Sequence, residues 1–222
     1  MVRARIVLSL FAVVLLASAF AFADNIVYDN GGPNQQNGNE MTNWTQSEDF
    51  VLSQNYNITD IHFWDIESSP GYAGSISWWI TGDSGGQPDF SKLFGSGSAN
   101  PTRVNTQCGI LGVYCEYSND WSINPLALLG GVTYHLVLHN GPIDHDSRDE
   151  FYWETTNNQV GEFGLECFLP NSACTSGTGA YASNGQEHAF YLTGNQVPEP
   201  GTLVLLGTGI LGGFAGLRRR FM

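Results

Sequence analysis

Basic residues are scarce in this chain of 222 residues, which has eight lysines and arginines against 21 aspartates and glutamates. Five of the eight lie near the two ends. Residues 24–196 therefore keep three basic and 20 acidic residues, a formal net charge of −17. Nucleic acid and anionic lipid headgroups are excluded as expected partners, because the Coulomb field of such a domain repels them. Calcium, cationic partners and neutral glycans stay open, as does the simpler interpretation that acidity keeps the domain soluble.

Long helical periodicity is also absent between residues 24 and 196. Short runs rich in Val, Ile, Tyr, Phe and Trp alternate there with clusters of Gly, Asn, Ser and Asp, a pattern typical of strands and turns. The pattern predicts one all-β domain, a two-sheet sandwich that is jelly-roll-like, with a closed barrel as the alternative. We expect strands at 26–29, 48–52, 58–66, 75–81, 132–140, 150–156 and 187–194, and weaker ones at 102–105, 113–117 and 179–183.

The first residues have the layout of a signal peptide. Two arginines precede an apolar run at 6–20, and an Ala-Phe-Ala tripeptide at 21–23 supplies the small residues that signal peptidase reads. We expect cleavage before Asp24. The chain then divides into a signal peptide at 1–23, an ectodomain at 24–196 and a C-terminal segment at 197–222.

Cysteine is rare, and no C-x-x-C occurs, so a zinc site is the less favoured interpretation. Cys108 and Cys115 are seven residues apart, and Cys167 and Cys174 repeat that spacing. In an exported chain this arrangement favours two local disulfides, Cys108–Cys115 and Cys167–Cys174, over the two crossed pairings.

The C-terminal segment has three parts in a fixed order. Pro198, Glu199 and Pro200 come first, 17 uncharged residues follow at 201–217, and Arg218, Arg219 and Arg220 come next. As a helix the 17 residues would be about 25 Å long, slightly short of a hydrocarbon core of about 30 Å. They predict a single transmembrane helix. The arginines are retained on the cytoplasmic side, so the ectodomain faces outward.

This order of Pro-Glu-Pro motif, glycine-rich span and arginine cluster resembles a PEP-CTERM sorting domain over about the last 26 residues. The resemblance implies recognition by an exosortase-type membrane protease, transient insertion in the inner membrane and removal of the tail. It also implies release or attachment at a bacterial cell surface, often alongside exopolysaccharide. An ordinary C-terminal membrane anchor is the alternative.

A second resemblance covers most of the ectodomain. The succession YDN, EDFVL, ITDIHFW, a W-x-I strand followed by D-x-G-G-x-P, FYW, and HAFYLTG directly before VPEP is similar to the ectodomains that precede PEP-CTERM tails in many bacterial proteins. It implies a β-sandwich surface domain and brings no catalytic residues with it.

One string invites a catalytic interpretation. GDSGGQP at 82–88 contains the sequence that surrounds the nucleophile of chymotrypsin-like serine proteases. That chemistry needs a histidine base and a buried aspartate, and in that family both precede the serine. Only His62 precedes Ser84, and no room exists for the first barrel. The string also fits an ordinary turn.

Other acid and base residues form no assigned catalytic group. His135 and His139 are four residues apart on one strand face, about 13 Å, which is too far for one metal. Glu48 and Asp49 are adjacent and so point to opposite faces of a strand. We therefore expect no catalytic residues and a protein that is not an enzyme.

The segment HNGPIDHDSRDE at 139–150 is rich in acidic residues. Asp144, Asp146, Asp149 and Glu150 could supply oxygen ligands to calcium, which binds six to eight oxygens from flexible loops. The EF-hand pattern is missing, however, and a solvated loop is the favoured alternative. Calcium is the one cofactor that the sequence leaves open.

Aromatic residues are plentiful and offer platforms for sugar rings. Trp44, Trp79, Trp121 and Tyr191 are the side chains that we expect to be exposed, while the alternative places them in the core. These patterns together predict an exported protein of the cell surface or extracellular matrix with a structural or adhesive role. A carbohydrate-binding module is the alternative, and a polysaccharide hydrolase or lyase is a more remote one. Expected partners are signal peptidase, an exosortase-type protease and exopolysaccharide.

Overall fold

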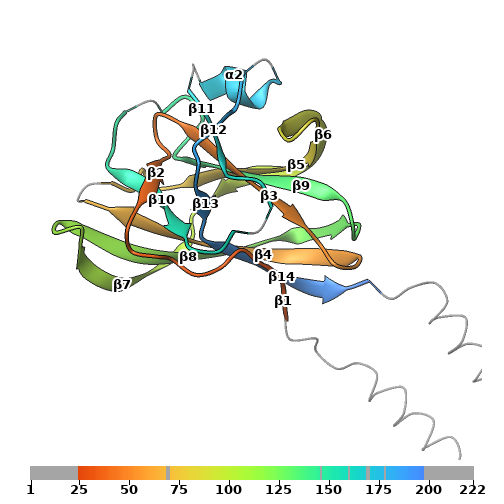
Figure 1. Ribbon diagram of the computed structural model, residues 1–222, viewed down its shortest axis with the longest axis horizontal. Coiled ribbons are helices and arrows are strands. Elements are labelled where there is room, and N and C mark those ends of the chain that lie inside the picture. Colours follow the sequence, from red (N-terminus) through yellow and green to blue (C-terminus); the bar gives the residue numbers. More distant parts are fainter. Residues whose placement is uncertain are drawn as a thin grey trace, which may run out of the picture.

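The computed structural model describes residues 25–197, apart from 69–70, 146, 160, 169–170 and 178. The expected signal peptide and the three parts of the sorting segment lie outside this range. No helix in the described range is long and apolar enough to cross a membrane. The described residues form two antiparallel sheets that pack face to face (Figure 1), which confirms the predicted all-β sandwich.

The strands are divided between two sheets. The first contains β1 (Asn25–Asp29), β2 (Gly38–Glu40), β4 (Tyr56–Glu67), β7 (Thr102–Ile110), β8 (Tyr114–Leu128), β10 (Phe151–Thr156), β13 (Glu187–His188) and β14 (Phe190–Gln196). The second contains β3 (Thr45–Val51), β5 (Ile76–Asp83), β6 (Pro88–Ala99), β9 (Thr133–Asn140), β11 (Leu165–Cys167) and β12 (Ala182–Ser183). One short helix, α2 (Asn171–Thr175), follows β11.

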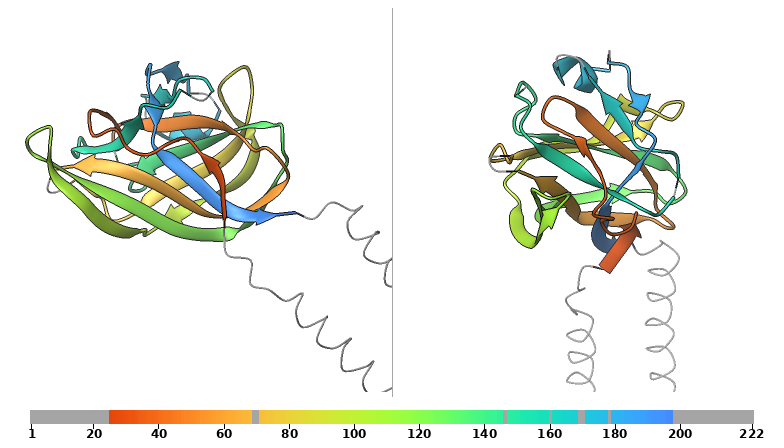
Figure 2. Two further views of the ribbon diagram at one scale, coloured as in Figure 1. Left: turned by 60° about the horizontal axis from the view of Figure 1, so that its bottom comes forward. Right: turned by 60° about the vertical axis from the view of Figure 1, so that its left-hand side comes forward.

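The strand order is that of a jelly roll. β4 pairs with β8 along one edge and with β14 and β10 along the other. The four main strands of the first sheet therefore have the order β1-β14-β4-β8, and they pack against the order β3-β9-β5-β6 in the second sheet. Connections from β3 to β4, from β4 to β5 and from β8 to β9 each cross between the sheets, as double Greek keys require. β1 and β14 lie side by side, and the β7–β8 hairpin extends at the opposite end of the sandwich (Figure 2).

The core follows from alternation along the strands. Ile61 and Phe63 of β4 face Trp78 of β5, and Tyr134 and Leu136 of β9 lie in the same buried cluster. Fully burying one such side chain stabilises the fold by about 1.5–3 kcal/mol. The described residues between 25 and 197 form both sheets and the buried cluster between them, so the ectodomain contains its own core.

A buried ion pair ties β7 to β4 across β8. The Arg103 guanidinium donates to both carboxylate oxygens of Asp65, at 3.0 and 3.1 Å, and lies 3.1 Å from Glu67. The Asp65 side chain is fully buried. Burial raises the pKa of Asp65 to about 7, although the nearby Arg103 charge lowers it. Three rings surround the same guanidinium at 4.3 to 5.5 Å: Tyr72, Tyr117 and Phe151.

Both predicted disulfides are confirmed. Cys108–Cys115 joins the facing strands of the exposed β7–β8 hairpin. Cys167–Cys174 joins β11 to α2 and is buried, where it packs against Tyr181 in a second small apolar cluster. The two bridges close loops of equal length in different surroundings.

This difference predicts unequal contributions to stability. Replacing Cys108 and Cys115 by alanine should cost about 2.5 kcal/mol, the chain-entropy value for a loop of this size. Replacing Cys167 and Cys174 by alanine should cost more, because packing against Tyr181 is lost as well. Urea unfolding of the two double variants measures both losses, and equal losses would contradict the structural role given to the buried bridge.

Candidate functional site

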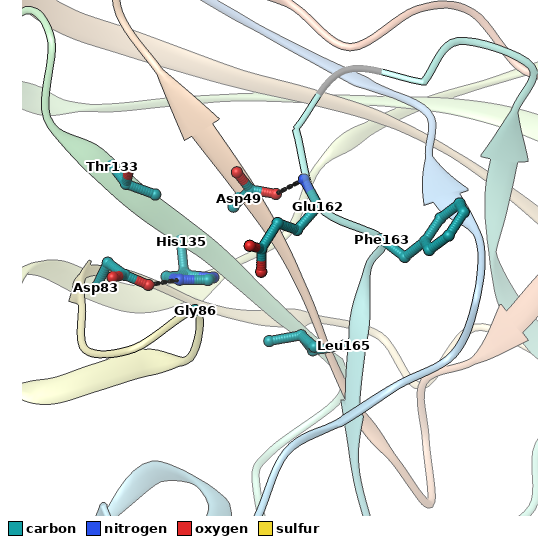
Figure 3. A pocket seen from close by; sticks show the side chains of 8 residues that line it. All are labelled: Asp49, Asp83, Gly86, Thr133, His135, Glu162, Phe163 and Leu165. Atoms are coloured by element: carbon teal, nitrogen blue, oxygen red, sulfur yellow. Dashed lines mark hydrogen bonds and ion pairs between the residues drawn. The ribbon is translucent and has the colours of Figure 1, made fainter.

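The described part of the chain has a small acidic pocket on the outer side of the second sheet (Figure 3). We call it the acidic pocket. Its volume is about 140 Å³. Asp49 of β3, Asp83 of β5 and His135 of β9 line it, and Glu162 closes it from the segment before β11. The Asp49 carboxylate accepts a hydrogen bond from the Glu162 backbone N–H at 3.1 Å. Burial raises the pKa of Asp49, while this hydrogen bond and the His135 charge lower it.

His135 connects a hydroxyl to a carboxylate at the wall of the acidic pocket. Its Nε2 lies 3.0 Å from Asp83 Oδ1, and its Nδ1 lies 3.4 Å from Ser47 Oγ. A serine, a histidine and an aspartate in this order resemble a hydrolase triad in composition. Ser47 is fully buried, however, and does not line the pocket. A substrate carbonyl in the pocket would not reach its hydroxyl, so the arrangement holds three strands of the sheet together.

A second group of ionisable residues lies behind the segment that closes the acidic pocket. Glu48 Oε2 accepts hydrogen bonds from the backbone N–H and the ring Nδ1 of His188, both at 2.8 Å. The Glu48 carboxylate is close enough to Glu187 for its charge to raise the pKa of Glu187. A Cβ at Gly164 would lie 2.5 Å from the His188 ring, so only glycine lets the segment approach so closely.

Burial shifts the pKa of each member of this group. It raises the pKa of Glu187 to about 8, with the Glu48 charge adding to the effect, and raises the pKa of Glu48 well above its usual range. It lowers the pKa of His188 to about 3. At neutral pH the histidine is neutral and the carboxyl pair retains a proton. Glu187 borders a second hollow of about 390 Å³ that shares Glu162 with the acidic pocket.

The residues of the GDSGGQP string form the turn between β5 and β6, as the alternative interpretation predicted. The Ser84 backbone N–H donates to the Gln87 carbonyl at 2.9 Å, and Gly85 and Gly86 have positive φ angles. Asp83 of this string does contact a histidine, but that histidine is His135 on the neighbouring strand β9.

His139, the second histidine considered on this strand, is buried, with Nε2 2.8 Å from the Thr42 carbonyl oxygen.

The four predicted sugar-stacking residues lie in separate places. Trp44 is half-buried against Phe168, and Trp79 lies half-buried on the outer face of the second sheet. Tyr191 is half-buried on the first sheet, stacked on His62 at 4.1 Å. Trp121 is 7% exposed and packs in the core, so the expectation that it would be exposed was wrong. Its position on β8 makes it a core-facing residue opposite Ile61.

The acidic loop after β9 is only partly described, because Asp146 lies outside the described residues. Asp144 is exposed. Asp149 lies 2.9 Å from the His145 Nε2, and Glu150 accepts a hydrogen bond from Ser68. Within the described ranges, no group of three or more His, Cys, Asp or Glu side chains is placed to hold a metal ion. Calcium binding by this loop stays a prediction.

The residues of the acidic pocket were not identified from the sequence. Asp49, Asp83, His135 and Glu162 come from four segments that the sheet brings together. The sequence signal that could have identified them was the alternation of side chains along β3 and β9, which places Asp49 and His135 on the face opposite the core. Without the strand order, the alternation could not show that these two side chains are neighbours.

The raised pKa of Glu187 predicts a pH dependence of stability. Between its usual value and about 8, the folded state holds a proton that the unfolded state releases. The stabilisation from this group is therefore complete at low pH and is lost as the pH rises through 8. The thermal midpoint should fall between pH 6.5 and 8, a window above the range in which His188 titrates, and the contribution of Glu187 should level off above pH 8. Glu187→Gln should make this fall shallower without removing it, because the pKa of Glu154 is also raised to about 8. The slope should change by at most about 1.4 kcal/mol per pH unit.

The matched control removes an exposed carboxylate that borders the same hollow of about 390 Å³. Glu162→Gln should leave the wild-type profile in place. A Glu187→Gln profile that equals the wild-type profile would contradict a Glu187 carboxyl group that keeps its proton in the folded state.

Comparison with known protein families gives one match. The PEP-CTERM protein-sorting motif matches residues 196–220. A search of curated proteins finds no match to the chain. The matched segment contains Pro198, Glu199, Pro200 and the arginine cluster at 218–220. The motif indicates an exported protein that is transiently anchored in the membrane and sorted by exosortase, a membrane protease.

Proposed function

We propose that the ectodomain is a structural or adhesive component of the cell surface or extracellular matrix and acts without catalysis. Signal peptidase removes residues 1–23, and the exosortase-type protease separates the tail from residues 24–196. The proposal is supported by the sorting motif that directly follows a single acidic β-sandwich. The location at the surface and the adhesive role go beyond what the motif indicates.

The non-catalytic part of the proposal rests on one observation, the burial of the serine and glutamate side chains that could otherwise take part in catalysis. The Ser47 hydroxyl lies behind His135 and does not line the acidic pocket. The Glu48 carboxylate is likewise fully buried and is bound by His188. General acid, base and nucleophile groups must reach the reacting atoms of a substrate, and these groups are instead bound within the fold.

A carbohydrate-binding role is the second candidate, and an aromatic cluster on the outer face of the first sheet favours it. Tyr191 stacks on His62 with ring planes 5° apart, and Trp64 lies 5.6 Å from Tyr191. Asp120 lies 3.4 Å from the His62 Nδ1, and Asp60 accepts a hydrogen bond from Thr193, whose hydroxyl contacts the His62 Nε2. Flat rings beside hydrogen-bonding groups suit a sugar, which has apolar and polar faces. Adhesion to exopolysaccharide would unite this candidate with the first.

The test separates binding from turnover. Residues 24–196 are incubated with the exopolysaccharide of the producing cells, and sedimentation with the polymer and the appearance of new sugar ends are measured. Binding without new ends is the expected result for an adhesive module. New reducing ends or unsaturated sugars would contradict the proposal. A matched Ser47→Ala variant would then show whether the buried hydroxyl has any part in the reaction.

A further inference from the structure

A groove runs along the side of the sandwich where β6 approaches β8. We call it the β6–β8 groove. It has a volume of about 630 Å³ and is lined by Trp78 and Trp121 and by residues around Asn100 and Asn124. β6 is the edge strand of the second sheet. The pairing of β7 with β8 ends at Asp120, so the groove lies between two strand edges that have no further partner in the described part of the chain.

Two tryptophans from opposite sheets form the inner wall of this groove. Trp78 of β5 is 9% exposed and Trp121 of β8 is 7% exposed, and both line the groove. The Trp121 indole N–H has no hydrogen-bond acceptor among the described residues. By contrast, the indole of Trp153 in the same core donates to the Ala189 carbonyl at 2.9 Å. An unpaired buried N–H costs roughly 1–3 kcal/mol, which marks the Trp121 side of the groove as incompletely satisfied.

Small residues on β6 keep the groove open. Gly97 and Ala99 lie on the core-facing side of this strand, opposite Trp78 and Ile76 respectively. A Cβ at Gly97 would lie 3.0 Å from the Trp78 indole nitrogen, so a larger side chain there would displace the ring. The Trp78 ring therefore packs directly against the glycines of β6, and only a small part of it reaches the groove.

The rim of the groove is polar but nearly uncharged. Asn100, Thr102, Ser122 and Asn124 offer amide and hydroxyl groups, and Asp120 is the only charged residue among the lining side chains. Asp120 already lies 3.4 Å from the His62 ring. In a domain of net charge −17, such a rim is unusual, and the surrounding field would repel an anionic polymer.

We propose that the β6–β8 groove binds a neutral polysaccharide, with sugar hydroxyls bonded to the asparagine and serine side chains of the rim and sugar C–H groups against the small exposed parts of the two indoles. Ligand sites of this kind combine aromatic walls with a few hydrogen-bonding groups. The inference rests on the adhesive role proposed above and gives that role a ligand class and a site.

The experiment uses residues 24–196 and three neutral probes, cellohexaose, maltohexaose and xylohexaose, with polygalacturonate as the anionic probe. Isothermal titration and tryptophan fluorescence measure binding. At least one neutral oligosaccharide should bind, and polygalacturonate should not. Ala99→Leu, which fills the groove from β6, and Asn124→Ala, which removes one exposed amide, should each weaken binding about tenfold, the equivalent of about 1.4 kcal/mol.

Asn157→Ala is the matched control, because Asn157 is also exposed and does not line the groove. It should leave affinity unchanged, and thermal midpoints show that each variant is folded. The proposal is overturned if no neutral oligosaccharide binds, if only polygalacturonate binds, or if both groove variants retain full affinity. If the domain sediments with exopolysaccharide while the groove variants retain binding, the adhesive role stands and the assignment of the groove is wrong.

Discussion

The ion pair between Arg103 and Asp65 is the interaction on which the rest of this domain depends. A fully buried carboxylate without a partner would cost about 3–5 kcal/mol, and Arg103 supplies the partner from another strand. The other two basic residues of the ectodomain, Lys92 and Arg148, are exposed. Because β7 follows β6 after only two residues, the same contact also holds the corner at Asn100, where the β6–β8 groove begins.

The remaining buried carboxylates are accommodated by protons and hydrogen bonds. Glu154 accepts a hydrogen bond from the Gln35 backbone N–H at 2.6 Å, and burial together with the Glu116 charge raises its pKa to about 8. Glu48 and Glu187 follow the same pattern beside His188. An acidic domain with few cations can keep carboxyl groups inside in this way. At neutral pH the raised pKa values of Glu154 and Glu187 keep these buried groups protonated.

Much of the fold could be predicted from the sequence, because alternation and turn residues are local signals. The seven principal expected strands all coincide with observed ones, and the equal cysteine spacing gave the correct pairing. β6 was missed, since an edge strand with the sequence PDFSKLFGSGSA has little to bury on either face. The partnership of Asp83 with His135 and that of Arg103 with Asp65 depend on strand order, which no local pattern contains. Trp121 was expected to be exposed, yet it is a buried residue that lines the groove.

The sorting motif indicates how the ectodomain is delivered, and the ion pair between Arg103 and Asp65 joins β7 to β4 beside the groove. The most direct measurement is a double-mutant cycle in urea unfolding between Arg103→Met and Asp65→Asn. If the ion pair holds β7 to β4, the double variant should lose less stability than the two single variants together, with a coupling of at least about 2 kcal/mol. Losses that add to within about 0.5 kcal/mol would show that the two residues act independently, and the central place given to this pair would be wrong.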